Sequence, residues 1–270
     1  MNQRKDARRY ARKGQSAIQG EKFESAIVYY SRALKLNKNK SHSLFGMAVA
    51  LAERERCKEA SILYKRVVAM DPNNSAAYYN LAFVLDMLGK IDESIEMYKE
   101  AIRLDPNDVD GYKNLAILLT SKGKCEEARE HYSKVLELKP SDIFLVSNGL
   151  GCLYFIQGMF AKASEEFQKS IALDEKFTHA YCNMSLILFC EKKVEEAEKY
   201  FQDGMKTLEN EGNKLKTIKE MMVSYTDHRT RLEAELNSSG MVNEEQRTLF
   251  GIMIDGLTKM IDLLTPHLEK

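Results

Sequence analysis

The chain has 270 residues, and its 40 basic and 40 acidic side chains cancel, so no global field favours nucleic acid or an anionic membrane. Only 4 prolines and 14 glycines interrupt a composition rich in helix formers, which indicates an all-α protein. No apolar run reaches membrane-spanning length, and the beginning MNQRKDARRYARKG is unlike a secretory signal. The 5 cysteines include no CxxC pair, so we expect reduced thiols and a cytoplasmic location.

Landmark residues recur with a period of thirty-four, broken by one interval of thirty-five. A closing proline stands at Pro72, Pro106 and Pro140. Each repeat has one small residue at Gly14, Ala48, Ala82, Ala116, Gly151 and Ser185, and another at Ala26, Ala60, Ser94, Ala128, Ala163 and Ala197. Four residues after the second comes an aromatic: Tyr30, Tyr64, Tyr98, Tyr132, Phe167 and Phe201. Such a period is typical of stacked structural repeats.

The repeat at 75–108 shows how each repeat divides into two helices. Residues 75–88 predict a first helix, helix A, and Gly89 supplies the permissive residue that ends it. A second apolar stripe from Ile91 predicts helix B, which the Asp-Pro pair at 105–106 closes because proline disfavours helical geometry in the residue before it. We expect the small residues to let the helices approach and the aromatic to fill the space between successive repeats. Neither helix can bury its apolar face alone, so the repeats must stack.

These landmarks together resemble the tetratricopeptide repeat (TPR) family. Six repeats are indicated, at 7–40, 41–74, 75–108, 109–142, 143–177 and 178–211. The resemblance implies an α-solenoid, a right-handed superhelix of helix–turn–helix repeats whose A helices line a concave groove that binds other proteins. The first repeat departs from the family pattern with Lys38 in place of the closing proline, and the fifth and sixth repeats also lack that proline.

An asparagine recurs on helix A at Asn80, Asn114 and Asn183. The extra residue in the fifth repeat leaves two possibilities there: Asn148 takes this position, or Gly149 does and Asn148 falls beside it. A π-bulge is one way of absorbing such a residue. The sequence alone leaves both registers open.

The asparagines lie beside apolar residues on the predicted groove side of helix A. A carboxamide has both a donor and an acceptor, so it can hold the backbone of an extended partner segment. Some TPR proteins, O-GlcNAc transferase among them, carry such an asparagine ladder, and the resemblance implies the same role here. The remaining groove residues are Phe45, Val49, Tyr79, Phe83, Met87, Lys113, Ile117, Leu186 and Phe189. The alternative is that the asparagines bond to neighbouring helices and stiffen the stack. The dicarboxylate clamp of co-chaperone members needs lysine and asparagine where Ala11 and Gln15 stand, so it is not expected.

The chain beyond 211 predicts further helices, with an apolar face at Leu215, Ile218, Met222 and Tyr225. Asn243 and Gln246 have the spacing of a capping box at the start of the last helix. That helix carries the stripe Phe250, Met253, Ile254, Leu257, Ile261 and Leu264. So wide an apolar surface needs cover, so the 212–270 region either caps the sixth repeat, which we favour, or folds back towards the groove, or mediates self-association.

The first helix is strongly basic, at Arg4, Lys5, Arg8, Arg9, Arg12 and Lys13. A solvated array end is the commoner meaning of such a cluster, and docking to an acidic partner is the other. No aromatic interleaving supports nucleic-acid binding.

No phosphate loop, HExxH sequence or nucleophile elbow is present, so we expect neither an enzyme nor a cofactor or metal site. The sequence predicts a non-enzymatic protein–protein interaction module: an adaptor, a co-chaperone-like receptor or a scaffold. The alternative function is a structural protein that oligomerises through its C-terminal helices.

Overall fold

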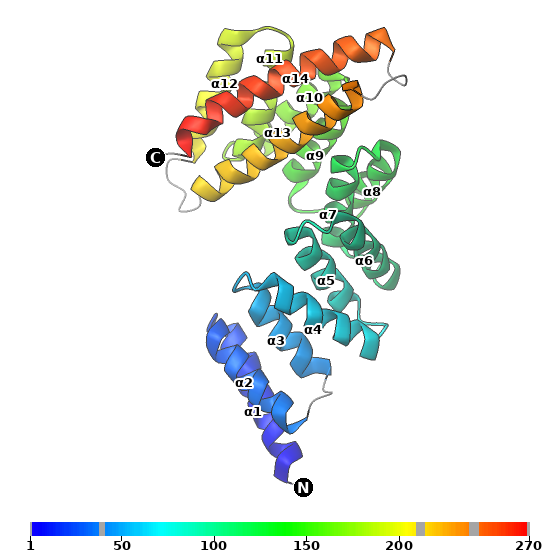
Figure 1. Ribbon diagram of the computed structural model, residues 1–270, viewed down its shortest axis with the longest axis vertical. Coiled ribbons are helices and arrows are strands. Elements are labelled where there is room, and N and C mark those ends of the chain that lie inside the picture. Colours follow the sequence, from blue (N-terminus) through cyan, green and yellow to red (C-terminus); the bar gives the residue numbers. More distant parts are fainter. Residues whose placement is uncertain (1, 38–40, 209–213, 238–242, 269–270) are drawn as a thin grey trace. The chain divides into compact units, whose positions relative to one another are not determined.

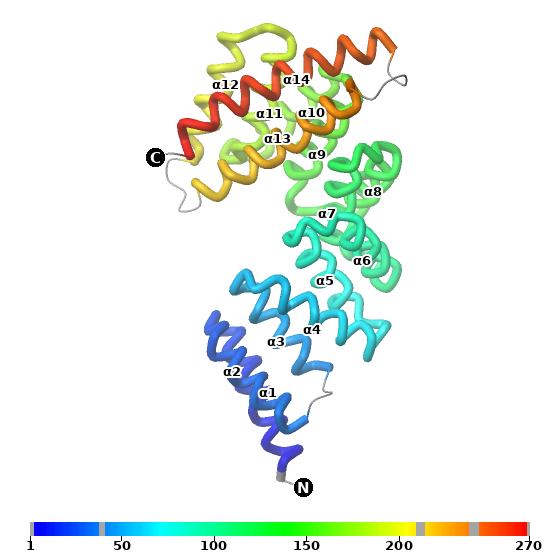
Figure 2. The backbone as a smooth tube through the Cα atoms, viewed as in Figure 1, coloured from blue at the N-terminus to red at the C-terminus, as the bar shows by residue number. Residues whose placement is uncertain are grey.

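The computed structural model describes residues 2–37, 41–208, 214–237 and 243–268 (Figure 1). Every regular element in these ranges is helical. A and B helices alternate as α1 (Asn2–Gln19) and α2 (Phe23–Leu36), α3 (Ser41–Ala52) and α4 (Cys57–Met70), α5 (Ser75–Met87) and α6 (Ile91–Leu104), α7 (Val109–Ser121) and α8 (Cys125–Glu137), α9 (Ile143–Ile156) and α10 (Phe160–Leu173), α11 (Thr178–Cys190) and α12 (Val194–Thr207). The chain path through these turns can be followed in Figure 2. Within the described ranges no helix is long and apolar enough to cross a membrane.

The chain divides into two compact units, an N-terminal unit of residues 1–118 and a C-terminal unit of residues 119–270. In the N-terminal unit the A helices contact one another directly, α1 with α3 and α3 with α5. In the C-terminal unit α9 contacts α11 in the same way. Two further helices, α13 (Lys214–Asn237) and α14 (Glu244–Leu264), and the short 3₁₀ helix η1 (Thr265–His267) complete the C-terminal unit.

The helix-B aromatic packs into space that small helix-A residues leave open. A Cβ atom added to Gly14 would lie 2.8 Å from the Tyr30 ring, and one added to Gly46, in the next repeat, would lie 2.3 Å from it. In the C-terminal unit, Cβ atoms would lie similarly close at Gly149 against Tyr132 and at Gly151 against Phe167. The Tyr30 ring therefore packs against its own repeat and the next one, the Tyr132 ring against the next repeat, and the Phe167 ring against its own.

Hydroxyl groups satisfy backbone carbonyls where two small residues bring helices A and B together. Ser94 Oγ donates to the Ala82 carbonyl over 2.7 Å, and Ser185 Oγ donates to the Ala197 carbonyl over 2.7 Å. In the first pair the serine is on helix B, and in the second it is on helix A. Each serine thus fills the small position without leaving its own polar group unpaired in the core.

The turn from helix A to helix B needs one residue in the left-handed backbone region. Gly89, Gly123 and Gly158 occupy it with φ of 71°, 72° and 72°. In the first, second and sixth repeats the same place is held by Glu21, Glu55 and Lys192, with φ of 55°, 58° and 62°. Side chains other than glycine pay a steric cost in this conformation, so three of the turns are strained.

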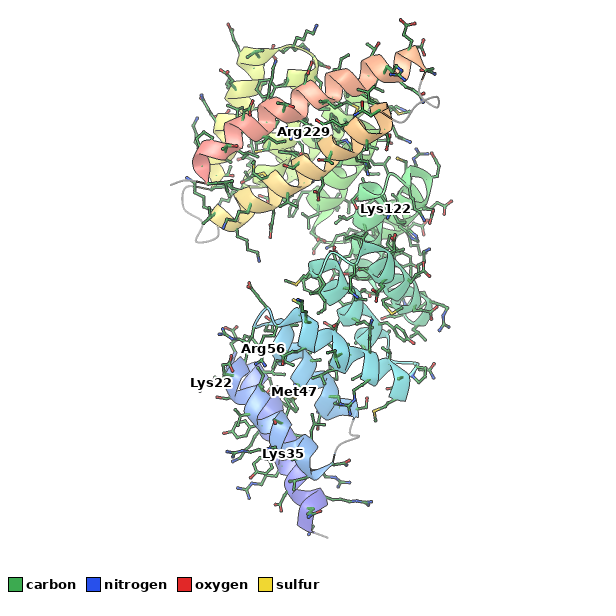
Figure 3. All side chains as sticks on the ribbon, in the orientation of Figure 1. Lys22, Lys35, Met47, Arg56, Lys122 and Arg229 are labelled. Atoms are coloured by element: carbon green, nitrogen blue, oxygen red, sulfur yellow. The ribbon has the colours of Figure 1, made fainter. Side chains whose placement is uncertain are left out.

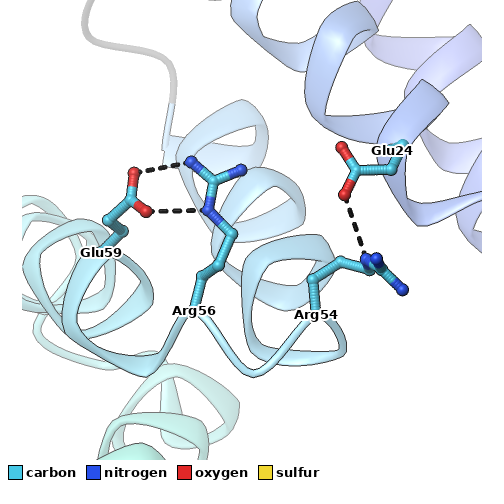
Figure 4. A network of polar contacts seen from close by, with 4 residues as sticks. All are labelled: Glu24, Arg54, Arg56 and Glu59. Atoms are coloured by element: carbon cyan, nitrogen blue, oxygen red, sulfur yellow. Dashed lines mark hydrogen bonds and ion pairs between the residues drawn. The ribbon is translucent and has the colours of Figure 1, made fainter.

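Ion pairs surround the turn of the second repeat (Figure 4). Arg54 Nε bonds Glu24 Oε1 over 3.0 Å, and Arg56 binds both oxygens of Glu59 over 2.8 and 2.9 Å. Lys22 holds the place of Arg56 in the first repeat, and both are labelled in Figure 3. All four paired side chains are well exposed, so these pairs contribute little to stability.

The fifth repeat absorbs its extra residue early in helix A. Val146 is fully buried, as Ala77 and Ala180 are in the equivalent place, which puts the insertion before it. Gly149 faces Tyr132 as Gly46 faces Tyr30. Gly149 therefore holds the recurring asparagine position, and Asn148 lies beside it. Helix α9 is α-helical from Ile143 to Ile156, without the π-bulge that the sequence left open.

The predicted capping box at the start of α14 is confirmed. Asn243 Oδ1 accepts from the Gln246 backbone N–H over 2.8 Å, and Gln246 Oε1 accepts from the Asn243 backbone N–H over 3.1 Å. Two N–H groups that the helix leaves without internal partners are satisfied in this way. The NSSG break that precedes the cap lies mostly outside the described residues.

We expect Glu55→Gly to stabilise the protein by about 1 kcal/mol, because glycine adopts the left-handed conformation at the A–B turn without steric cost. The larger backbone entropy that glycine loses on folding offsets part of this gain. Urea denaturation followed by circular dichroism measures the change. Gly89→Ala is the matched reverse substitution, since no atom lies within 4 Å of the added Cβ, and it should destabilise by a similar amount. A destabilised Glu55→Gly would contradict the strain argument.

Candidate functional site

The A-helix face of the N-terminal unit gathers the predicted groove residues of α3, α5 and α7. Its members are Phe45, Val49, Tyr79, Asn80, Phe83, Met87, Lys113, Asn114 and Ile117. Among the described residues of the A helices, Phe83, Met87 and Ile117 are the exposed large apolar side chains, at 44%, 50% and 46%. Phe83 and Ile117 hold the same place in successive repeats, and Met87 lies one helical turn beyond Phe83. These three residues form an apolar stripe on α5 and α7.

Two of the predicted groove aromatics instead stabilise their own repeats. The Phe45 ring lies edge-on to Tyr64 with centroids 5.7 Å apart, and the Tyr79 ring lies edge-on to Tyr98 at 5.6 Å. Each pair joins helix A to helix B of one repeat, in an arrangement that aromatic quadrupoles favour. Val49 is half-buried and packs into the same core as Phe45.

Asn114 behaves as the stiffening alternative predicts. Its Nδ2 donates to the Tyr79 hydroxyl over 3.1 Å and to the Tyr98 hydroxyl over 3.2 Å. Burial raises the pKa of both phenols above the ordinary value, while the bond from Asn114 acts the other way. The amide donor of Asn114 is therefore committed to holding the third and fourth repeats together.

Asn80 has no such bond to a neighbouring helix. Its Nδ2 donates over 2.7 Å to the Ala76 carbonyl, one turn back on its own helix. The aromatic that corresponds to Tyr98 is Tyr64, and its buried hydroxyl has no hydrogen-bond partner in the part of the chain that the structure describes. Asn80 thus keeps only a local contact, which a bound molecule can replace at small cost.

Lys113 lies against the surface rather than extending into solvent. Its Nζ pairs with Asp110 Oδ1 over 2.8 Å, and only 12% of its side chain is exposed. The ion pair spans i and i+3 on α7, so it fixes the lysine locally. The positive charge that the sequence placed on this face is therefore largely neutralised.

Asn183, in the C-terminal unit, is enclosed on all its polar atoms. Its Nδ2 donates to Asn148 Oδ1 over 2.9 Å and contacts Cys152 Sγ at 3.5 Å. The Tyr225 hydroxyl of α13 donates to Asn183 Oδ1 over 2.9 Å. Burial raises the pKa of Tyr225 well above its ordinary value, so the hydroxyl remains a donor. Asn183 therefore does not present its amide to a partner as predicted, and the half-buried Asn148 has its Oδ1 committed to Asn183.

Leu186 and Phe189 are also covered, which corrects their assignment to an open groove. They are 4% and 5% exposed. A Cβ added to Gly256 of α14 would lie 3.3 Å from Leu186 Cδ1, and Lys259 Nζ lies 5.6 Å from the centre of the Phe189 ring. The chain's own C-terminal helices occupy this part of the A-helix surface.

Helix α13 contacts three A helices in turn. Beyond the Tyr225 bond to α11, the His228 ring lies 5.6 Å from Phe155 of α9, and Arg231 donates to the Ser121 carbonyl at the end of α7. Burial and the nearby Arg231 lower the pKa of His228 to about 4. His228 is therefore neutral at physiological pH, and its Nδ1 lies 2.7 Å from Arg231 Nη2.

The apolar stripe of α14 faces its own chain. Met253, Leu257 and Leu264 are fully buried, and Phe250, Ile254 and Ile261 pack against the same core, which includes residues of α11, α12 and α13. This stripe, predicted to be a cap or an oligomer surface, is used for internal packing, because α11 and α13 offer a matching apolar face. On α13, Ile218 and Tyr225 are buried as predicted, whereas Leu215 is exposed.

The basic cluster of α1 stands where later repeats have packing residues. Arg9 is exposed at the place that Ser43, Ala77 and Gly111 occupy as buried residues. Lys13 likewise replaces Leu81 and Leu115. Charges at these positions disfavour the stacking of a further repeat, which agrees with a solvated array end.

Burial raises the pKa of Cys152, Cys182 and Cys190 to about 12 each. Cys182 and Cys190 lie in the hydrophobic core that includes residues of α13 and α14, and Cys152 packs against it. Their thiols are therefore protonated at neutral pH and shielded from reagents. In the described part of the chain, no cluster of three His, Cys, Asp or Glu side chains has metal-binding geometry.

Models of the tetratricopeptide repeat match residues 17–82, 75–108, 97–130 and 146–177. The chain belongs to the tetratricopeptide repeat family. The predicted all-α TPR solenoid fold is confirmed, and TPR repeats make this chain a protein–protein interaction module. No curated protein matches the chain.

Solved structures support the same fold. A tetratricopeptide repeat protein from Parabacteroides merdae matches with a TM-score of 0.70 and 15% identity, covering 93% of this chain and 99% of that one. PilF of Pseudomonas aeruginosa matches with a TM-score of 0.59 and 18% identity over 77% of this chain and 92% of its own. YrrB, described as a TPR protein with an unusual peptide-binding site, matches with a TM-score of 0.58 and 22% identity over 63% and 88%.

We expect Tyr225→Phe to loosen α13 from the repeats. It leaves Asn183 Oδ1 buried without its donor, at a cost of about 1–2 kcal/mol, so the detached fraction should rise roughly 5- to 30-fold. Alkylation of Cys182 at pH 8, followed by peptide mass spectrometry, reports detachment because that thiol is buried in the closed state.

Tyr29→Phe is the matched control, since no hydrogen bond of its hydroxyl is found among the described residues. It should leave Cys182 alkylation unchanged, while Cys125, which is only half-buried, should react quickly in every variant. An unchanged Cys182 rate in Tyr225→Phe would show that the hydroxyl does not hold α13 in place.

Proposed function

We propose that the chain binds a segment of a partner protein on the A-helix face of its N-terminal unit, and that it acts as a non-enzymatic adaptor or scaffold. The observation that carries this proposal is the apolar stripe of Phe83, Met87 and Ile117, which is about half exposed. Adjacent apolar side chains left in contact with water mark an interaction surface. Burying the remaining area would contribute on the order of 1 kcal/mol for each residue.

The neighbouring amides supply polar contacts for such a segment. Asn80 is held only by the bond to its own helix, so both of its polar atoms can turn to a ligand. Asn114 uses its donor internally, but its Oδ1 accepts no hydrogen bond from a described residue. The face therefore offers two amide oxygens beside an apolar stripe. Two amide oxygens in a row could accept hydrogen bonds from the backbone N–H groups of an extended segment.

This proposal narrows the region predicted from the sequence. Asn183, Leu186 and Phe189 fall away as contacts for a partner while α13 and α14 cover them. Asn148 has its Oδ1 committed to Asn183. Phe45, Val49 and Tyr79 pack in the core of their own repeats, beside the exposed residues of this face. A co-chaperone-like role would be one use of this surface. The oligomerisation alternative has no exposed α14 stripe to support it.

Affinity retention tests the proposal, with the full chain as bait. We expect a partner protein that the wild type retains to be lost from the double variant Phe83→Glu with Ile117→Glu, with binding at least about tenfold weaker, because two apolar contacts become charged. Both positions are half exposed, so the fold should be kept, which circular dichroism verifies.

Ile62→Glu is the matched control. Ile62 is the most exposed large apolar residue of the described chain and lies on helix B of the second repeat, away from the A-helix face. It should retain the same partner as the wild type. If all three baits retain the same proteins equally, the A-helix face is not the binding surface.

Asn80→Ala separates the amide from the apolar stripe. Because Asn80 makes only a local bond, its loss should leave the free energy of unfolding within about 0.5 kcal/mol of the wild type. Binding of the retained partner should weaken several-fold if the amide contacts it. Asn114→Ala is the contrasting variant: it removes the donor to two tyrosines and should destabilise by about 1–2 kcal/mol. Equal binding by Asn80→Ala and wild type would remove the amide from the site.

A further inference from the structure

The A-helix surface occurs both open and covered within this chain. Phe83 is 44% exposed, and Leu186, in the same place in the sixth repeat, is 4% exposed. Met87 is 50% exposed, and its counterpart Cys190 is 6% exposed. Asn80 likewise corresponds to Asn183. Leu186 and Cys190 lie against Gly256 of α14, and Asn183 bonds Tyr225 of α13. The covered copy therefore accepts α-helices.

The helix that covers the asparagine position is amphipathic. Helix α13 buries Ile218, Met221, Tyr225 and Leu232, which fall at intervals of three, four and seven residues along one side. Its opposite side is exposed and carries charges, as at Lys216 and Glu220, together with the exposed apolar residues Leu215 and Val223. The Tyr225 hydroxyl meets Asn183 Oδ1, so the recurring amide acts as an acceptor for a side chain of the covering helix.

The state of the amides also favours a helix over an extended strand. A helix satisfies its own backbone groups, so it does not require the donor that Asn114 has already committed to Tyr79 and Tyr98. An extended segment would need both donors and acceptors along its backbone. The acceptors that remain, on Asn80 and Asn114, match a hydroxyl donor such as that of Tyr225.

We propose that the partner segment is an amphipathic α-helix that lies across α3, α5 and α7. A hydroxyl-bearing side chain would face Asn80 as Tyr225 of α13 faces Asn183, and apolar side chains would face Phe83, Met87 and Ile117 as α14 faces Leu186 and Cys190. The inference rests on the proposed function and specifies the conformation of the bound segment. Neighbouring helices lie about 8–10 Å apart, so a helix of about 14 residues, roughly 21 Å long, spans three of them.

The chain itself provides the probe. A fluorescent peptide with the sequence of α13, Lys214–Asn237, carries the tyrosine that bonds the covered asparagine and the apolar side that packs beside it. It is titrated into the full chain and followed by anisotropy. The tethered α13 has a high effective concentration at its own site, so the added peptide should bind the open face.

Two peptide variants separate a helix from an extended segment. A lactam that joins Lys216 to Glu220, both exposed and four residues apart, pre-forms the helix without touching the buried side. It should tighten binding several-fold, because less ordering is needed on association. Ser224→Pro, at another exposed position, breaks the helix and should weaken binding at least tenfold.

Chain variants locate the bound peptide. Phe83→Glu with Ile117→Glu should weaken binding at least tenfold, and Ile62→Glu should leave it unchanged. The inference would be overturned if the peptide bound the double variant as tightly as the wild type, or if the lactam peptide did not bind. Equal or tighter binding of the proline peptide would overturn the helix and leave the proposed function standing, with an extended partner.

Analytical ultracentrifugation of the chain without peptide tests whether a second copy of the chain occupies the A-helix face. A concentration-dependent dimer that the Phe83→Glu and Ile117→Glu substitutions abolish would identify a second copy of the chain, which would also overturn the inference. The affinity-retention experiment tests the proposed function independently of these peptide measurements, because it asks only whether any partner protein binds the A-helix face.

Discussion

The contact between a helix-B aromatic and small helix-A residues is the constraint on which the rest of the structure depends. The Tyr30 ring occupies the volume that side chains at Gly14 and Gly46 would need, so one ring sets the spacing of two successive A helices. On α9, the Tyr132 ring occupies the volume that a side chain at Gly149 would need, and the Phe167 ring does so at Gly151. Protein interiors are close-packed, so a larger side chain at these positions would force the helices apart. The spacing in turn decides which side of each A helix is left for other contacts.

The asparagines show how one repeat position can either join neighbouring helices or stay available to a partner. Asn114 lies within reach of two tyrosine hydroxyls and binds both, whereas Asn80 has Phe45 in place of the first tyrosine and remains on its own helix. Asn183 is enclosed by α13. An amide is costly to bury unpaired, so each takes the partners that its neighbours offer. The recurring residue is thus a stiffener in two repeats and a candidate contact in one.

The C-terminal helices turn the α9 and α11 part of a repetitive surface into core. Their apolar stripes would be a liability in water, and the A helices α9 and α11 would likewise expose Leu186 and Phe189. Packing them together removes both exposures and buries Cys190 against Gly256 of α14. No described helix of the repeats covers Phe83 and Ile117 in the N-terminal unit. That difference supports binding there, and it makes the covered surface a guide to the chemistry of a partner.

The sequence by itself determined the period, the helix pairs, the glycine turns and the α14 capping box, because these depend on residues within one helix or in two adjacent ones. It also identified Phe83, Met87 and Ile117 as a side separate from the core. Only the tertiary structure decided that Gly149 rather than Asn148 holds the asparagine position, since a one-residue insertion is resolved by packing against Tyr132. The bond from Tyr225 to Asn183 joins residues forty-two apart, and the sequence offered several apolar faces on which α13 and α14 could have packed. Burial of long helices follows from shape and area shared between distant segments, which no local pattern encodes.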